Sequence, residues 1–488
     1  MNSHRPTNWK PGRGKSDRAR LVVFDVLMAV EEEEAYANLV LPREIRRAHL
    51  NKQDAAYATN LCYGTLRLQG RWDAILSHCI SDRSIVDLDS AVRVLLRMGA
   101  HQLLDFSTPV HAAINETVVI ARNELSQGVA GFVNAVLRRV SERSLAQWKE
   151  QLKADAGGKV NTVAFLSTWY SHPQWIVRAL DKALRHHGRV HKDILRVLEA
   201  DNTPAAVTLA ARGISVEDLR KDISRGHMGS AEGQLVDTSV ILHGGDPYRV
   251  FAVKDRLAGV QDEGSQLVAR ALAGAPIETE DDIWLDMCAG PGGKTATLAA
   301  LAVDRGSQIH ANELHPHRLE LVLDSIQPWG DIVSVRQGDG RDFGSPEHTD
   351  LVPANGYARI LIDAPCTGIG ALRRRPEARW RKQAGDALDL AVIQAELLEA
   401  GWKALRPGGV LGYSTCSPYL TETSAIVEEF MASHPDAVKL DTPAIASGES
   451  LVELSGSNGE LQLWPDIHNS DAMFLSLIAK QPYSSESA

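Results

Sequence analysis

Apolar positions recur with a helical period over residues 17–145. One face collects Val92, Leu95, Leu96, Gly99 and Leu103. A second stripe collects Val129, Phe132, Val133, Val136, Leu137 and Val140. Strand-like alternation is absent, and the only prolines, Pro42 and Pro109, stand where helices would begin or end. The pattern therefore predicts an all-helical domain.

From residue 281 onward short apolar runs alternate with helical patterns, as in an open, doubly wound parallel sheet. The predicted strands lie near 283–287, 308–312, 332–335, 359–363, 410–414 and 473–478. The predicted helices include Leu388 to Leu405 and one that opens near Asp262 or Ser265, either of which could cap it. Residues 256–482 are therefore expected to form one α/β domain.

The region between these domains is less regular. Residues 146–255 are predicted to form a linker, with a hinge at Ala156–Lys159, and then a small α+β subdomain. Residues 436–460 are rich in Ala, Ser and Gly and are expected to be an exposed insertion. Residues 1–16 carry four basic side chains and no acidic one, which predicts a flexible basic tail.

Composition narrows the class of protein. A chain of 488 residues is long enough for two or three domains, and its 44% hydrophobic content is typical of globular proteins. No apolar run approaches the length of a membrane span, about 18 residues, and the basic N-terminus lacks the core of a secretory signal. We therefore expect a cytoplasmic protein without a membrane partner. The net charge of −10 neither favours nor excludes nucleic acid.

The five cysteines are Cys62, Cys79, Cys288, Cys366 and Cys416. Their odd number and wide spacing indicate neither a disulfide framework nor a metal site. Reduced thiols are expected. A cysteine with a chemical role would then act as a nucleophile or as an acid–base group.

The first strand of the predicted sheet runs into a glycine-rich turn. The turn reads Cys288, Ala289, Gly290, Pro291, Gly292, Gly293 and Lys294, and a helix follows it. Backbone N–H groups of such a turn face an anionic or polar ligand. A phosphate-binding loop would need glycine in place of Cys288, and a dinucleotide loop would need one more glycine. A nucleotide hydrolase with a modified phosphate loop and a purely structural turn remain alternatives.

Acidic residues follow four successive strands: Asp286, Glu313, Asp339 and Asp363. Ligands bind at the carboxyl ends of parallel strands. Glu313 suits paired ribose hydroxyls, and Asp339 suits an adenine amino group. Each acid alone could simply cap a helix. Together they favour a nucleoside with a cationic tail, such as S-adenosylmethionine.

Two cysteines also stand at this edge of the sheet. Cys366 follows the fourth strand in a Gly/Pro-containing turn, and Cys416 follows the fifth in a Ser/Pro-containing turn. Carbon 5 of a pyrimidine becomes nucleophilic when a thiolate adds to carbon 6. One cysteine would attack, and the other would assist elimination. The pattern alone does not choose between them, and two buried small hydrophobes are the alternative.

The helical region resembles the RNA-binding domain of the antitermination factor NusB. The resemblance rests on Tyr36–Asn38, Asp54–Tyr57, Tyr63–Arg67 and Gly131–Arg138. That domain also occurs fused to RNA methyltransferases. The resemblance implies contact with RNA.

Nearly the whole chain resembles the bacterial 16S ribosomal RNA cytosine-C5 methyltransferases of the B type (Fmu or Sun proteins). The motifs that carry the resemblance are Cys288–Lys294, Asn312-Glu313, Gly338–Arg341, Asp363–Gly368 and Ser414–Ser417. The resemblance implies a class I methyltransferase (Rossmann-like) domain behind an all-α NusB-like domain and a small α+β subdomain. It also implies transfer of a methyl group from S-adenosylmethionine to carbon 5 of a cytosine in small-subunit RNA.

The same resemblance implies residue roles. Cys416 is the nucleophile, and Cys366 helps to release the product. Cys288–Lys294, Glu313, Asp339 and Asp363 bind S-adenosylmethionine. The chain departs from the family pattern at Thr208–Ala211, at Pro465–His468 and at Asp471–Phe474, which puts some substrate contacts in doubt.

A basic segment follows the first cysteine turn. Its candidate RNA-binding residues are Arg373, Arg374, Arg375 and Trp380, since arginines pair with phosphates and tryptophan stacks on bases. A solvated charged helix start is the alternative. Reaching carbon 6 requires an unstacked cytosine, so we expect a loop or partly unfolded ribosomal RNA as substrate and a monomeric enzyme. A non-catalytic RNA-binding assembly factor is the remaining alternative.

Overall fold

A computed structural model describes residues 16–81, 83–106 and 108–482, and the chain divides into two compact units. Unit 1 contains Met1–Arg178 together with Leu372–Arg381. Unit 2 contains Ala179–Ala371 and Lys382–Ala488. The predicted basic tail lies outside the described residues except for Ser16.

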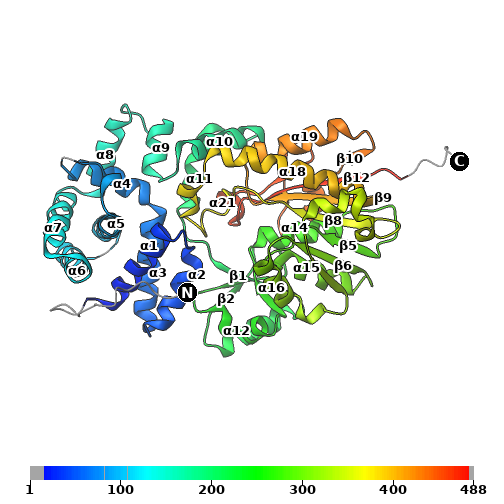
Figure 1. Cartoon of the computed structure of the whole chain (residues 1–488), viewed down its shortest axis with the longest axis horizontal. Helices are drawn as coiled ribbons and strands as arrows, with labels where there is room; N and C mark the ends of the chain where they lie inside the picture. The colour runs from blue at the N-terminus through cyan, green and yellow to red at the C-terminus, as the bar shows by residue number, and fades with distance from the viewer. Residues whose placement is uncertain (1–15, 82, 107, 483–488) are drawn as a thin grey trace. The chain divides into compact units, whose positions relative to one another are not determined.

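Unit 1 is helical, as the apolar periodicity predicted (Figure 1). Its helices are α1 (Arg18–Glu32), α2 (Ala37–Arg47), α3 (Lys52–Arg67), α4 (Gln69–Cys79), α5 (Ser90–Leu104), α6 (Val110–Ile120), α7 (Gln127–Ser141), α8 (Leu145–Asp155) and α9 (Val163–Trp169). Side chains cap several of them: Asp17 caps α1, Asn51 caps α3, and Ser144 forms a capping box at α8.

The two apolar stripes meet in the core of unit 1. Leu95 and Leu96 of α5 and Val133 and Leu137 of α7 are fully buried. Gly99 is required at this crossing, because a Cβ atom there would lie 2.6 Å from Cδ1 of Leu137. Close approach of α5 and α7 therefore depends on a missing side chain as well as on the apolar ones.

Unit 1 also holds the ten-residue segment Leu372–Arg381, which ends in α17 (Ala378–Arg381). The guanidinium of Arg379 is fully buried and donates to the carbonyls of Arg67 (2.9 Å) and Ser171 (3.2 Å). Arg381 donates to the carbonyls of Val30, Glu34 and Ala35, at and just beyond the C-terminal end of α1. The segment is thus a packed part of the helical unit.

Unit 2 begins within α10 (Gln174–His186) and continues through α11 (Ile194–Asp201) into a small sheet. Its strands are β1 (Val207–Ala211), β2 (Ser230–Glu232), β3 (Ser239–Leu242) and β4 (Ala258–Val260), ordered β2-β3-β1-β4 and antiparallel throughout. Helices α12 (Val216–Arg225) and α13 (Phe251–Lys254) lie between them in the chain. This is the predicted α+β subdomain.

The main sheet contains all six predicted strands and two short additional ones. Its members are β5 (Ile283–Asp286), β6 (Gln308–Glu313), β7 (Val333–Gln337), β8 (Tyr357–Asp363), β9 (Leu405–Thr415), β10 (Ala437–Lys439), β11 (Leu461–Gln462) and β12 (Phe474–Lys480). The order is β10-β12-β9-β8-β5-β6-β7, with β11 paired to β12. Strands β5 to β9 are parallel, and β10 to β12 are antiparallel additions at one edge.

Helices cover both faces of this sheet (Figure 1). One face carries α14 (Glu263–Gly274), α15 (Gly293–Val303) and α16 (Pro316–Ser325); the other carries α18 (Ala384–Ala404) and α19 (Ser424–Ser433). Consecutive strand residues alternate between the two cores: Leu361 faces the first, and Ile360 and Ile362 face the second. Burial on both faces explains the continuous apolar runs in the sequence.

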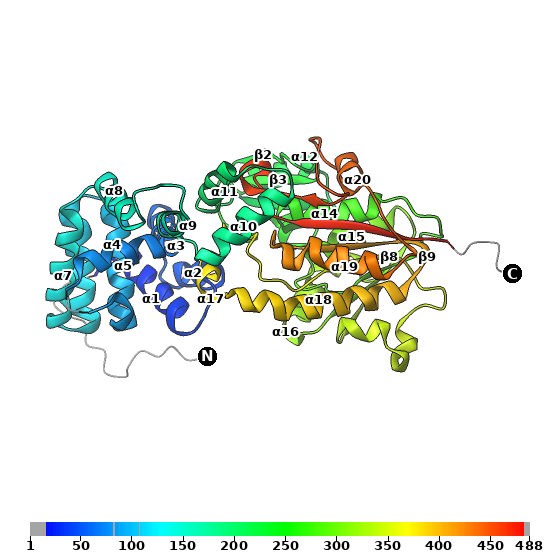
Figure 2. The ribbon, with the colours of Figure 1, turned by 90° about the horizontal axis from the view of Figure 1, so that it is seen from above.

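The expectation of an exposed insertion at residues 436–460 is wrong for β10 and α20 (Thr442–Gly448), although the stretch after Gly448 includes the exposed Leu451 and Val452. Strand β10 pairs with β12, which runs beside β9 (Figure 2), and α20 packs on α14. Thr442 and Ala446 are fully buried. Small residues were mistaken for a solvent-exposed loop because they permit close packing as readily as flexibility. The helix at Glu263 is capped by Asp262 and not by Ser265.

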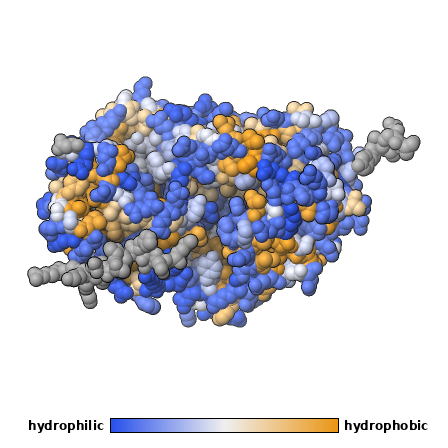
Figure 3. Space-filling view, viewed as in Figure 1, coloured by the Kyte–Doolittle hydropathy of each residue, from blue (hydrophilic) through white to orange (hydrophobic). Residues whose placement is uncertain are grey.

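The face drawn in Figure 3 is mainly hydrophilic, with apolar patches scattered over it. Within the described residues, no helix combines the length and apolar character that crossing a bilayer requires.

Arg379→Ala is expected to destabilise unit 1 by about 2–4 kcal/mol, because two buried carbonyls lose their donor. Amide hydrogen exchange of the full chain would detect this as faster exchange in α3 and α4. Arg43→Ala is the matched control, since the Arg43 side chain is 72% exposed. Unchanged exchange in Arg379→Ala would contradict a structural role for the segment.

Candidate active site

The glycine-rich turn connects β5 to α15. Gly292 caps the helix with φ of +98°, a conformation that glycine adopts without strain, and a Cβ atom there would lie 2.8 Å from Cβ of Ser325. Gly290 donates its N–H to Oε2 of Glu313 (3.0 Å), and a Cβ atom at Gly290 would lie 2.2 Å from the same oxygen. A Cβ atom at either glycine would collide with Glu313 or with α16, so the glycines permit close packing of the turn against these parts of the protein.

Asp286, at the end of β5, is fully buried beneath this turn. Its Oδ2 accepts a hydrogen bond from the Thr295 hydroxyl at 2.7 Å. Burial, with the nearby charge of Asp363, raises the pKa of Asp286 to about 7, although Thr295 and Lys294 oppose the shift. The group therefore changes protonation near neutral pH.

Lys294 forms an ion pair with Asp363, with Nζ 2.7 Å from Oδ2. Burial by itself would lower the pKa of Lys294, but Asp363, Cys416 and Asp286 together raise it. Lys294 is therefore a charged ammonium within electrostatic range of Cys416. The sequence motif placed Lys294 in the cofactor loop but did not indicate this proximity to a cysteine.

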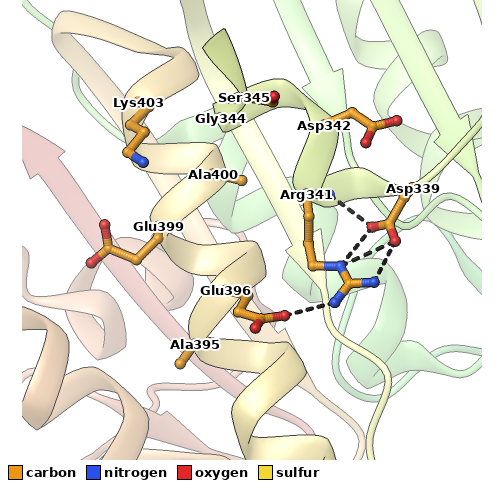
Figure 4. Close-up of a pocket in the computed structure, with 10 residues that line it drawn as sticks. All are labelled: Asp339, Arg341, Asp342, Gly344, Ser345, Ala395, Glu396, Glu399, Ala400 and Lys403. Carbon is orange, nitrogen blue, oxygen red and sulfur yellow. Dashed lines mark hydrogen bonds and ion pairs between the residues drawn. The ribbon is translucent and has the colours of Figure 1, made fainter. Parts of the chain in front are cut away.

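The other two predicted acids differ in their surroundings. Glu313 is buried, and its Oε1 accepts the His315 N–H at 2.8 Å while Oε2 accepts that of Gly290. Asp339 is partly exposed and forms an ion pair with Arg341, which lowers the pKa of Asp339 and also contacts Glu396 (Figure 4). Asp339 lines an open cavity of about 650 Å³ to which the glycine turn and the cysteines do not contribute.

The two cysteine turns meet. Strands β8 and β9 are paired so that Asp363 lies opposite Ser414, and the turns that follow bring Sγ of Cys366 to 3.5 Å from Sγ of Cys416. The hydrogen bond to Cys416 is the main cause that raises the pKa of Cys366, and burial adds to it. Cys288 lies in the glycine turn, where burial raises the pKa of its thiol.

Residues that the sequence analysis did not single out hold these turns together. Gly370 donates its N–H to the carbonyl of Cys416 at 2.9 Å. The buried carboxylate of Glu422 accepts hydrogen bonds from Thr367 and Ser417. The only sequence signal was an acidic residue six positions after Cys416, which is too common a feature to indicate a role.

The predicted RNA-binding residues all lie in the segment that belongs to unit 1. Arg373 is buried, Arg374 is half-buried, and Arg375 and Trp380 are exposed. The guanidiniums of Arg375 and Arg381 lie 5.2 Å from the ring centroid of Tyr36. Of the four, Arg375 and Trp380 are accessible to a ligand.

One departure from the family pattern has a structural partner. Asp466 forms two hydrogen bonds with Arg189, at 2.9 and 2.6 Å, and contacts Arg196. The altered segment at 465–468 therefore contributes to packing within unit 2.

The arrangement fits a nucleoside-containing methyl donor. Carboxylates end β5, β6 and β8, and Asp339 follows β7, so acceptors for hydroxyl and amino groups lie at the carboxyl edge of the parallel strands. Among the residues described, no group of three or more His, Cys, Asp and Glu side chains could hold a metal ion.

Comparison with known proteins places this site in a family. Residues 274–479 match the family model described as 16S rRNA methyltransferase RsmB/F, and residues 17–142 match the NusB family. A Mycobacterium tuberculosis protein named as a methyltransferase is 42% identical over 97% of this chain and 99% of its own length. A Bacillus subtilis protein named "Probable ribosomal RNA small subunit methyltransferase B" is 31% identical over 96% of this chain and 100% of its own length.

Among solved structures, that of PH0851 has the same fold, with a TM-score of 0.77 at 21% identity over 96% of this chain and 100% of that one.

Asp286→Asn should change how stability depends on pH. The pKa of Asp286 is raised from 3.8 to about 7, so its contribution to stability is complete below about pH 4 and is lost as the pH rises towards 7. The free energy of unfolding of Asp286→Asn minus that of the wild type should therefore grow by roughly 1.4 kcal/mol per pH unit up to about pH 7. Urea titrations at several pH values measure it.

The control for this titration is Gln308→Ala, because the exposed Gln308 side chain carries no titratable group. The difference in free energy of unfolding between this control and the wild type should stay nearly constant over the same pH range. A constant difference for Asp286→Asn as well would contradict the raised pKa.

Proposed function

Since this chain belongs to the 16S rRNA methyltransferase RsmB/F family, we propose that it methylates carbon 5 of a cytosine in small-subunit ribosomal RNA. The methyl donor is S-adenosylmethionine, and the reaction passes through a covalent bond between Cys416 and carbon 6. The observation that carries the proposal is the 3.5 Å separation of the two thiols beside the glycine turn. A nucleotide hydrolase or a structural glycine turn has no use for this pair.

Cys416 is the nucleophile in this proposal, and its position beside a cation supports the assignment. The ammonium of Lys294 lies within electrostatic range of Cys416, and a nearby cation stabilises a thiolate. The thiolate adds to carbon 6 of the cytosine. The electron pair of the C5–C6 double bond shifts, and carbon 5 becomes nucleophilic.

When bound, S-adenosylmethionine supplies an electrophilic methyl group to this carbon. Residues Cys288–Lys294, Glu313, Asp339 and Asp363 would hold it. Backbone N–H groups of the turn can face the donor, and the carboxylates accept from hydroxyl and amino groups.

Cys366 takes part in the elimination step. Its pKa is raised mainly by its hydrogen bond with Cys416, and burial and the charges of Glu422 and Asp363 add to the shift. Once the Cys416 sulfur is bonded to carbon 6 it carries no charge, so the largest cause disappears and only burial and the two carboxylates still raise the pKa of Cys366. The Cys366 thiol can then lose its proton to solvent and accept the carbon-5 proton as a thiolate. The C5–H electrons re-form the C5–C6 double bond, and Cys416 leaves with its electron pair.

The helical unit would supply RNA contacts, as its membership of the NusB family suggests. Within it, Arg375 and Trp380 are proposed to face phosphate and base, with Arg373 and Arg374 supporting the segment. An accessible cytosine must be unstacked to reach Cys416, so the substrate is proposed to be a loop or partly unfolded region, bound by a monomer.

Cys416→Ala should abolish methyl transfer to 16S ribosomal RNA, by at least about a thousandfold, because no other group can form the carbon-6 bond. Transfer of labelled methyl from S-adenosylmethionine measures activity, and bisulfite sequencing locates the cytosine. Cys62→Ala is the control, since Cys62 is buried in unit 1. Normal activity of Cys416→Ala would falsify its role.

Cys366→Ala should give a different defect. Addition and methyl transfer proceed, but elimination stalls, so protein covalently bound to RNA accumulates. Denaturing gel electrophoresis of protein with labelled RNA detects the adduct. The double variant with Cys416→Ala should form none. If Cys366→Ala turned over normally, or if the adduct persisted without Cys416, the two roles would have to be reassigned.

A further inference from the structure

Glu422 touches both cysteine turns at once. It ends the 3₁₀ helix η8 (Leu420–Glu422) and is fully buried. Its Oε1 accepts the Thr367 N–H at 2.6 Å, and its Oε2 accepts the hydroxyls of Thr367 (2.5 Å) and Ser417 (2.7 Å). Thr367 directly follows Cys366, and Ser417 directly follows Cys416. One carboxylate therefore bridges the residues next to both thiols.

Neutral donors alone satisfy this carboxylate. Nε2 of Gln394 is the fourth donor, 3.5 Å from Oε1. No Lys, Arg or His of the described chain forms an ion pair with Glu422. Burying a carboxylate without a cation costs several kcal/mol, which its hydrogen bonds offset only in part. An apolar side chain would fill the same space at a lower cost, so packing alone does not explain an acid here.

Glu422 is itself held in place by the elements beneath it. Its backbone carbonyl accepts from the Tyr413 hydroxyl on β9 at 2.8 Å. Gln394 of α18 donates to the carbonyl of Pro365 at 2.8 Å as well as to Glu422. The carboxylate is thus anchored to the strand that leads to Cys416 and to the helix that contacts the Cys366 turn.

We infer that Glu422 is a positioning residue that fixes the spacing of the Cys366 and Cys416 turns for the methyl-transfer cycle. The inference rests on the proposed function, but the geometry that it describes can be tested without catalysis. Apart from the thiol pair itself, the turns also contact each other directly: the Gly370 N–H donates to the Cys416 carbonyl, and the Thr367 and Ser417 hydroxyls lie 3.3 Å apart.

The reaction depends on this spacing because Cys366 must remove a proton from the same cytosine to which Cys416 is bonded. A thiol displaced by about 1 Å can lower a rate on the order of a hundredfold. The charge of Glu422 also contributes, after Cys416 and burial, to raising the pKa of Cys366. Position and charge must therefore be separated by experiment.

The spacing can be measured with dibromobimane, which becomes fluorescent after both of its arms have alkylated thiols. Each arm forms one C–S bond and releases bromide, and the thiol proton passes to buffer. The folded wild type should be bridged between Cys366 and Cys416, and Cys366→Ala gives the background from other thiols. The same samples are assayed for kcat and KM with ribosomal RNA and for S-adenosylmethionine binding.

Glu422→Ala should slow bridging about tenfold and lower kcat about a hundredfold, with KM and S-adenosylmethionine binding little changed. Glu422→Gln keeps an oxygen for the Thr367 N–H, and its amide N–H groups can donate to hydroxyls that rotate to accept. It should therefore retain wild-type bridging and most of kcat. This rescue by a neutral isostere separates position from charge.

Glu460→Gln is the matched control. Glu460 is another fully buried carboxylate of unit 2, but it contacts Ser424 and Lys439 and neither cysteine turn. It should match the wild type in bridging and in kcat. If Glu422→Ala fails to fold, Ser417→Ala removes one end of the same bridge and should show a smaller loss in both measurements.

The outcomes are distinct. Wild-type bridging and wild-type kcat in Glu422→Ala and Ser417→Ala would overturn the inference. It would also be overturned if Glu422→Gln bridged normally but had a kcat as low as that of Glu422→Ala. A wild type that bridges but methylates no cytosine, with Glu422→Ala bridging slowly, would overturn the proposed function and leave the positioning role in place.

Discussion

The parallel register of β8 and β9 is the constraint on which the rest of the site depends. Asp363 pairs with Ser414, so both strands end at the same level of the sheet. Cys366 lies three residues beyond the end of β8, and Cys416 lies one residue beyond the end of β9. A slip of the register by one residue would exchange the two faces of a strand and separate the turns. Backbone hydrogen bonds, and not the thiols themselves, thus determine which two cysteines meet.

The two thiols differ in the charged groups that surround them. Lys294 forms an ion pair with Asp363 at this edge of the sheet, and its positive charge interacts with Cys416. Cys366 instead faces Cys416 and the negative charges of Glu422 and Asp363. Two identical side chains, 3.5 Å apart, thereby have different charged neighbours, which supports the different roles proposed for them.

The cysteine turn after β8 is followed closely in the sequence by a segment of the helical unit. Leu372, six residues after Cys366, begins the segment that packs within unit 1, and Arg379 and Arg381 hold it through main-chain carbonyls. Arg379 and Arg381, which share this basic segment with the candidate RNA-binding residues, thus have intramolecular partners. Buried arginines are costly to expose, so RNA contact is better sought at Arg375 and Trp380.

The sequence by itself determined the helical unit, the six main strands and the glycine turn, because periodicity and glycine placement are local properties. It also placed Cys366, Cys416 and the acids at one edge of the sheet, because parallel strands end together. Tertiary structure alone decided the 3.5 Å thiol pair, the burial of Thr442 and Ala446 and the bridging carboxylate of Glu422. These depend on pairings between residues far apart in the chain, and composition does not distinguish a buried small residue or acid from an exposed one.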